Sequence, residues 1–376
     1  MIESSPAASD VTGEALVEPR PLSERIASAA WRTVRLSLGL FLFVGALQLM
    51  KTGAAALDIL QHRGLLVHNA GSTLGLGWLG ALFVLSGSPV AATSLALVSA
   101  HSITETMGFT MLTGSRLGAA FVVLVTAVIY ALRGKEGRRK APVSTAVMAL
   151  TTTAIIYIPA AVVGLALLHW GAYHGLKLSF GQQFSNLIDL VYGGILEWAK
   201  LQPPGLVFLG GLAALLLAFR VIDTVLPEMD KKTENPNRVA LMSRKWPMFG
   251  IGSVVALITM SVSVALTVLV PLVAKGYVKR ENILPYIMGA NITTLGDTML
   301  AAFALHSPAA VRIVLAELIC TTTLSVLVLR FFYPQLRTLM WRFQRQVVKS
   351  KPRLAGFTAG LFLVPLSVML LSSGLT

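Results

Sequence analysis

Residues 76–104 read LGWLGALFVLSGSPVAATSLALVSAHSIT, and this stretch decides the fold. It is long enough to cross a bilayer, yet Ser86, Gly87, Ser88 and Pro89 interrupt it. A non-helical turn at membrane depth is tolerated only where protein or a water-filled cavity covers it. We therefore expect 76–104 to enter the membrane, turn at the serines and return to the same side.

The composition indicates an integral membrane protein and argues against a soluble enzyme. The chain has 376 residues, of which 55% are hydrophobic and 13% are charged, and its mean hydropathy is +0.73. A soluble domain carries about 25% charged residues. The single Cys320 rules out an intrachain disulfide. Apolar blocks cover 34–50, 76–104, 109–132, 143–168, 205–222, 248–274, 283–305, 309–330 and 355–374.

The net charge of +14 comes mainly from three basic segments between apolar blocks, at 133–140, 223–247 and 331–353. The positive-inside rule places these segments in the cytoplasm, which explains the charge without a nucleic-acid partner. Segment 169–204 carries only Lys177 and Lys200 and is expected on the outside. The sides of the membrane assigned to these loops agree with the number of crossings only if two blocks, 76–104 and 248–274, do not cross the membrane. The alternative is that another block has been wrongly assigned as a membrane span.

The two candidate hairpins resemble each other at a fixed offset, which pairs Ser86 with Ser261, Ser88 with Ser263 and Gly114 with Gly289. The parity of the crossings gives the two halves opposite orientations. Inverted repeats of this kind are an architecture of secondary transporters, whose site lies where the repeats meet. The predicted fold is an all-α polytopic protein with two inverted repeats, each containing a re-entrant hairpin. Its regions are a disordered cytoplasmic tail (1–30), a first repeat (31–170), an extracytoplasmic loop (171–204), a second repeat (205–333), and a basic cytoplasmic loop with a final transmembrane helix (334–376).

Serines at the two hairpin tips are candidate anion ligands. A break between two half-helices exposes backbone N–H groups and the positive end of a helix dipole. Two facing tips would surround an anion with these groups and with the hydroxyls of Ser86, Ser88, Ser261 and Ser263. The alternative is that these serines are small residues for close helix packing.

The stretch Gly289-Ala290-Asn291-Ile292-Thr293-Thr294 is a candidate cation site. Glycine permits a helix to unwind, and the oxygens of Asn and Thr together with freed carbonyls suit a hard cation such as Na⁺. The predicted Na⁺ ligands are Gly289, Asn291, Thr293, Thr294, Asp297 and Ser263.

Charged residues inside apolar blocks are functional candidates because a charge is expensive in hydrocarbon. Arg116 and Asp297 stand out because each lies close to a glycine motif. The alternative role for them is a buried structural ion pair, or for Arg116 a side chain that reaches the interface. Arg312 and Glu317 are expected to be packing partners or interfacial.

Several of these motifs together resemble the type II sodium/phosphate cotransporter family. The opening helix from Leu38 to Met50 is similar, and the family carries a QSSS motif and a GANIGTT-like motif in each of two inverted repeats. Here the second pair of motifs reads Met260-Ser261-Val262-Ser263 and Gly289-Ala290-Asn291-Ile292-Thr293-Thr294. The first reads Leu85-Ser86-Gly87-Ser88 and Gly114-Ser115-Arg116-Leu117-Gly118. The Gln positions are thus apolar, and Arg116 replaces an Asn.

The resemblance implies phosphate bound between the hairpin tips, with Na⁺ nearby. We expect a Na⁺-coupled phosphate symporter of the plasma (inner) membrane that works by alternating access, with no cofactor, no enzymatic activity and no nucleic-acid partner. The expected anion ligands are Ser86, Ser88, Ser261, Ser263, Arg116 and Asn291. We expect Arg116 to supply a fixed charge toward the anion, with Asp297 as its counter-ion when the site is empty.

Two alternatives to this function stay open. One is a carrier of the same fold for another small anion, or an exporter with a different coupling ion. The other is a membrane scaffold or a membrane-embedded enzyme.

Overall fold

The computed structural model describes residues 22–55, 67–133, 140–172, 182–224, 244–259, 261–274, 278 and 282–373. Nearly all of these residues are helical, and none of them lies in a β-strand. The prediction of an all-α chain is confirmed. The physical reason is that an apolar chain in lipid must satisfy its backbone polar groups internally, as a helix does.

Six helical stretches in the described residues are long and apolar enough to cross a membrane. Large apolar side chains such as Leu132, Leu206 and Leu371 are exposed on their outer surfaces, as lipid contact requires. These features fit a multi-pass membrane protein. The six stretches are Ala30–Ala55 in α1 (Leu22–Ala55), Glu105–Leu132 across α5 (Glu105–Ala119) and α6 (Phe121–Arg133), Ala141–His169 in α7 (Lys140–His169), Pro204–Ile222 in α9 (Pro204–Asp223), Pro308–Val348 across α15 (Pro308–Leu327), a π-helical turn η2 (Val328–Phe332) and α16 (Tyr333–Val348), and Lys351–Ser372 in α17 (Lys351–Ser373).

Two pairs of shorter helices occupy the blocks predicted to be hairpins. The first pair is α3 (Ala70–Val84) and α4 (Ser88–Ser99), and the second is α11 (Lys245–Thr259) and α12 (Val262–Ala274). The longest of them has 15 residues, or about 22 Å, which is short of the roughly 30 Å hydrocarbon core. Leu85 ends α3 in the left-handed conformation with φ 57°, so the chain turns at the predicted position.

Glycines bring α3 unusually close to α5 in the first half. A Cβ on Gly77 would lie 2.1 Å from the carbonyl oxygen of Met111, and one on Gly114 would lie 2.2 Å from that of Leu74. No real Cβ tolerates such a distance, so the two backbones touch only because both positions lack a side chain.

The second half repeats this contact between α11 and α13 (Ile283–Thr293). A Cβ on Gly252 would lie 2.1 Å from the carbonyl oxygen of Tyr286, and one on Gly289 would lie 2.1 Å from that of Phe249. Each of these four residues stands 175 positions after its counterpart in the first half. The internal similarity seen in the sequence is therefore present in the packing.

The glycine motifs do not unwind their helices, contrary to our expectation. Helix α5 runs without interruption through Gly114, and α13 runs through Gly289 and Asn291. The interruptions come later, at Ala120 before α6 and at Thr294 before α14 (Leu295–Ala304). The physical reason is that these two glycines serve close helix packing, and their helical hydrogen bonds stay intact.

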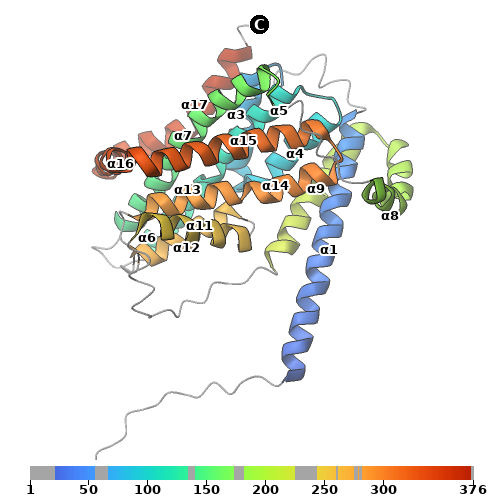
Figure 1. The fold of residues 1–376 in the computed structure, drawn as a ribbon, viewed down its shortest axis with the longest axis horizontal. Coiled ribbons are helices and arrows are strands. Elements are labelled where there is room, and N and C mark those ends of the chain that lie inside the picture. Colours follow the sequence, from blue (N-terminus) through green and yellow to red (C-terminus); the bar gives the residue numbers. More distant parts are fainter. Residues whose placement is uncertain are drawn as a thin grey trace, which may run out of the picture.

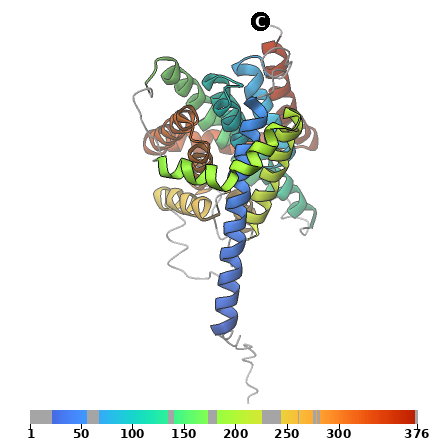
Figure 2. The same cartoon turned by 90° about the vertical axis from the view of Figure 1, so that its right-hand side faces the viewer.

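Helices α1 and α9 lie antiparallel against each other. Gly53, near the end of α1, contacts the backbone of Phe208 near the start of α9. Gly39, earlier in α1, contacts Ile222 near the end of α9. Figures 1 and 2 both show the N-terminal part of α1 projecting beyond the other helices.

Three predicted boundaries require correction. Residues 22–30, expected in a disordered tail, form the start of α1, while residues 1–21 lie outside the described part of the chain. A helix, α8 (Gln182–Lys200), occupies most of the segment predicted to be an extracytoplasmic loop (Figure 1). The basic segment 331–353 is mainly helical and continues α15, because its apolar side chains recur on one helix face and pack inward.

We predict that Gly252→Ala destabilises the protein by at least about 1–3 kcal/mol, because the new methyl group forces α11 away from α13. The matched control is Gly250→Ala on the same helix, where a Cβ meets nothing within 4 Å. That substitution should leave the protein as stable or slightly more stable, since Ala favours a helix over Gly. Thermal unfolding in detergent measures both, and equal effects would contradict the close-contact role.

Candidate functional site

Arg116 and Asp297 form a buried ion pair that links α5 to α14. Arg116 Nη2 lies 3.7 Å from Asp297 Oδ1, and the two residues are 3% and 7% exposed. Arg116 Nη2 also donates a hydrogen bond to the Thr298 hydroxyl, which in turn donates to Asp297 Oδ1 at 2.8 Å. The structure thus brings together the two charged residues that the sequence singled out.

Glu317 adds a second buried carboxyl group from α15. The side chain is fully buried, and the Thr113 hydroxyl donates to its Oε2 at 2.9 Å. We expected Glu317 to be a packing partner of Arg312 or interfacial, but Arg312 forms a two-bond ion pair with Glu105 of α5. The reason is that residues five apart on a helix point in different directions.

Helix α7 contributes Tyr157 and Thr153, which both hydrogen-bond to Asn291 of α13. The Tyr157 hydroxyl donates to the backbone oxygen of Asn291 at 2.8 Å, and Asn291 Nδ2 donates to the Thr153 hydroxyl at 2.9 Å. Tyr157 lies within electrostatic reach of the Arg116, Asp297 and Glu317 side chains. We call Arg116, Asp297, Glu317, Thr113, Thr298 and Tyr157 the central cluster.

The guanidinium group and the two carboxyl groups of the central cluster each have one buried polar atom without a hydrogen-bond partner among the described residues. These atoms are Arg116 Nε, Asp297 Oδ2 and Glu317 Oε1. Leaving such an atom unsatisfied costs about 1–3 kcal/mol, and more when the group is charged. One donor and two acceptors with spare capacity are what a site for an anion and a cation needs.

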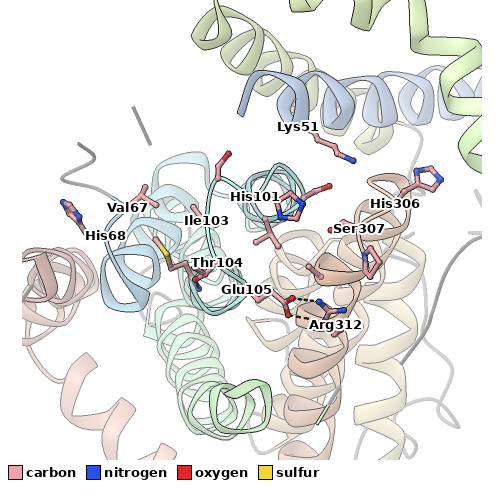
Figure 3. A pocket seen from close by; sticks show the side chains of 16 residues that line it. Lys51, Val67, His68, His101, Ile103, Thr104, Glu105, His306, Ser307 and Arg312 are labelled. Carbon is pink, nitrogen blue, oxygen red and sulfur yellow. Dashed lines mark hydrogen bonds and ion pairs between the residues drawn. The ribbon is translucent and has the colours of Figure 1, made fainter. Parts of the chain in front are cut away.

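A cavity of about 750 Å³ opens at one end of α5 and α15 (Figure 3). The Glu105–Arg312 ion pair lies on one side of it, and Lys51 and His306 lie on the other (Figure 3). Lys51 Nζ donates to the backbone oxygen of Leu305 at 3.2 Å. Burial and the nearby Lys51 charge lower the pKa of His306, so its imidazole is mainly neutral at pH 7.

Both ends of the α3–α4 pair lie at this cavity. His68, before α3, and His101, after α4, line it together. The turn between the helices lies elsewhere, because Gly87 packs against Ala119 and the backbone oxygen of Ser115 on α5. The two outer ends of the pair thus line one cavity, and the turn between the helices packs beside the residue that precedes Arg116.

The predicted tip serines lie at the turns. Ser86 and Ser88 are half-buried on either side of Gly87. The Ser261 hydroxyl accepts a hydrogen bond from Val264 N–H at 3.3 Å and so caps α12. The side chain of Ser263, and Met260, lie outside the described part of the chain.

The predicted Na⁺ ligands are engaged with several different partners. Gly289 packs against Phe249, and the Thr293 hydroxyl donates to the backbone oxygen of Ser253 at 2.8 Å. The Thr294 hydroxyl donates to the Asn291 backbone oxygen at 3.0 Å. Asp297 is paired with Arg116 across the protein, as described above.

Sequence reasoning missed the place of Glu317, Thr113 and Tyr157 in the central cluster. A charged residue in the middle of block 309–330 was the available signal for Glu317. No sequence signal marks Thr113 or Tyr157, since both residue types are common in apolar helices.

Comparisons with protein-family models, with curated proteins and with solved structures give no match to this chain.

We predict that Arg116→Gln destabilises the protein by about 3–5 kcal/mol, because it leaves Asp297 buried without its positive partner. The double variant Arg116→Gln, Asp297→Asn should recover more than half of that loss. Arg342→Gln, at an exposed position on α16, is the matched control and should have little effect. Thermal unfolding in detergent measures all three, and a double variant no more stable than the single one would contradict the pairing.

Proposed function

We propose that this protein is a secondary transporter for a small anion, with the central cluster as part of its binding site. The observation that carries the proposal is a buried group of one guanidinium and two carboxyl groups, each with an unsatisfied polar atom, in a helical protein whose described residues include six potential spans. Charges at membrane depth that face the interior mark substrate and ion pathways.

Two helices lead from the cavity to the central cluster. On α5, Met107 lines the cavity and Arg116 follows nine residues later, about 14 Å deeper. On α15, Arg312 lines the cavity and Glu317 follows five residues later, about 8 Å deeper. The cavity and the buried charges are therefore about 8–14 Å apart along these helices.

Two of the three basic segments, 133–140 and 331–353, begin at the ends of these two helices that lie away from the cavity. Helix α6 continues α5 to Arg133, and α16 continues α15 into a segment rich in arginine. By the positive-inside rule, the cavity then opens toward the outside of the cell. The α3–α4 pair is in this arrangement a re-entrant hairpin that enters from outside.

Equivalent contacts of the two halves support an inverted repeat. Helix α4 contacts α14 and α15 of the other half, and α12 contacts α6 and α7. Each half thus places its hairpin against the interrupted helix and the following helix of its partner half. A site where two such halves meet can be exposed alternately to either side.

We assign the anion to Arg116 and the substrate to inorganic phosphate. The planar guanidinium offers paired donors that match phosphate, and its charge persists at any working pH. The resemblance to sodium/phosphate cotransporters supports phosphate as substrate and Na⁺ as coupling ion, with the tip serines beside the anion. A carrier for another anion is the second candidate, because Leu85 and Met260 stand at the Gln positions of the motifs.

We predict that single cysteines at His68 and His101, in a Cys320→Ala background, react with a membrane-impermeant maleimide added from the same side. Both positions are exposed and line the cavity at the two ends of the hairpin. A cysteine at the exposed Arg342 of α16 should react only from the opposite side. Reaction of the two hairpin ends from opposite sides would overturn the re-entrant assignment.

We predict that the purified protein in liposomes takes up radiolabelled phosphate, and that an inward Na⁺ gradient increases the uptake over a choline gradient. Arg116→Lys keeps the charge but loses the paired donors, so phosphate affinity should fall about 10- to 100-fold. The exposed Arg342→Lys is the matched control and should behave as the unmodified protein.

Uptake no greater than in protein-free liposomes would reject phosphate transport. The same assay would then be repeated with sulfate and small carboxylates to test the second candidate. Uptake of phosphate that ignores Na⁺ would retain the carrier and reject sodium coupling.

A further inference from the structure

Glu317 is more isolated than the other carboxyl group of the central cluster. It is fully buried, and the Thr113 hydroxyl is the one side-chain donor that reaches its carboxyl group among the described residues. Its other oxygen, Oε1, has no hydrogen-bond partner there. Asp297, in contrast, has both Thr298 and the Arg116 guanidinium beside it.

The charges around Glu317 do not balance. The titratable or charged residues on the elements that pack against α15 are Arg116 and Glu105 of α5, Lys140, Tyr157 and His169 of α7, Tyr286 of α13, Asp297 of α14 and Arg330 of η2, while α4 supplies none and α15 itself carries Arg312 and Cys320. Lys140 and His169 are the first and last residues of α7, each about 18 Å or more along the helix from Tyr157. Glu105 is neutralised by Arg312 at the cavity, and Tyr286 donates its hydroxyl to Ala265 on α12. One positive charge, on Arg116, thus faces two carboxyl groups.

A second carboxylate without its own cation is unfavourable at this depth. Removing an ionised carboxylate from water costs several kcal/mol, and an opposite charge compensates it only when the geometry is good. Arg116 directs Nη2 to Asp297 and Thr298, so its best contacts are already made. Glu317 therefore needs a positive partner that the described residues do not supply.

The ligand set around Glu317 suits a proton better than a metal ion. A hard metal cation such as Ca²⁺ or Mg²⁺ takes about six or more oxygen ligands, whereas Thr113 is the one side chain hydrogen-bonded to Glu317 among the described residues. The Thr113 hydroxyl lies 2.9 Å from Glu317 Oε2 and 3.0 Å from the Phe109 backbone oxygen, so it can donate to an ionised carboxylate or accept from a neutral acid while donating to Phe109. A proton needs only one oxygen, and Oε1 offers it.

We propose that Glu317 binds and releases a proton during each transport cycle. The proton enters from the cavity, whose wall includes Arg312 about 8 Å further out on the same helix. It forms the neutral acid at Oε1 while the anion occupies Arg116, and it leaves on the other side when the anion does. Protonation thus changes the charge of the central cluster by one unit as the substrate arrives. This inference rests on the proposed function for its coupling role, and Glu317 itself is not one of the predicted Na⁺ ligands.

Infrared difference spectroscopy of the purified protein tests the proton site without any transport. A step from acidic to alkaline pH should remove the C=O stretching band of a buried neutral carboxyl group. That band should be absent in Glu317→Gln, whose amide oxygen can still accept the Thr113 hydrogen bond. Glu317→Asp keeps an acid and should restore a band at a shifted position. The exposed Glu197→Gln of α8 is the matched control and should show the unmodified spectrum.

Proton movement in liposomes tests the coupling. With a pH-sensitive dye inside, addition of outside phosphate should acidify the lumen, and an inward proton gradient should raise uptake at least tenfold. Glu317→Gln should lose both effects, and Glu317→Asp should regain part of them.

A folded Glu317→Gln protein that keeps the infrared band would overturn the proton site, whatever the transport result. Phosphate uptake driven by Na⁺ with no proton movement would overturn the coupling role and leave the proposed function standing. Absence of phosphate transport together with the infrared band would reject the phosphate carrier and the coupling role, and keep the proton site.

Discussion

The ion pair between Arg116 and Asp297 is the interaction on which the arrangement of the two halves depends. A guanidinium cannot lose its proton at any working pH, so in an apolar interior it must keep a negative partner. Its partner comes from α14, which belongs to the other half of the chain. The ion pair therefore links the two halves in the buried interior, where separating the opposite charges would cost the most free energy.

Around this pair, each half contributes to the surroundings of the other. Helices α5 and α7 of the first half carry Thr113, Arg116 and Tyr157, whereas α14 and α15 of the second half carry Asp297, Thr298 and Glu317. A relative movement of the halves therefore changes the distances between opposite charges directly. A ligand that alters these charges biases the halves toward one arrangement, which is the physical requirement for coupling binding to a conformational change.

Much of the fold follows from the sequence, because its strongest signals are long apolar blocks and their interruptions. The turn at Leu85 and the charged pair Arg116–Asp297 were both expected from residue type and position. The helical state of segment 331–353 was not, because a basic composition hides an amphipathic face. The role of Gly289 was wrongly predicted as unwinding, since sequence alone does not distinguish a flexible glycine from one in close contact with a neighbouring backbone. The position of Glu317 beside Thr113 depends on how α5 and α15 pack, which local pattern does not encode.

The glycine contacts have a consequence for recognising similar chains. Gly77 and Gly114 in one half, and Gly252 and Gly289 in the other, have the same separation, although few of the intervening residues agree. What the halves share at these positions is the absence of a Cβ atom, because any side chain would collide with a carbonyl group of the neighbouring helix. Measures that score chemical likeness residue by residue give little weight to such a pattern. Two glycine pairs of equal spacing, each joining a short apolar helix to a longer one, would identify distant chains of this architecture whose remaining residues have diverged.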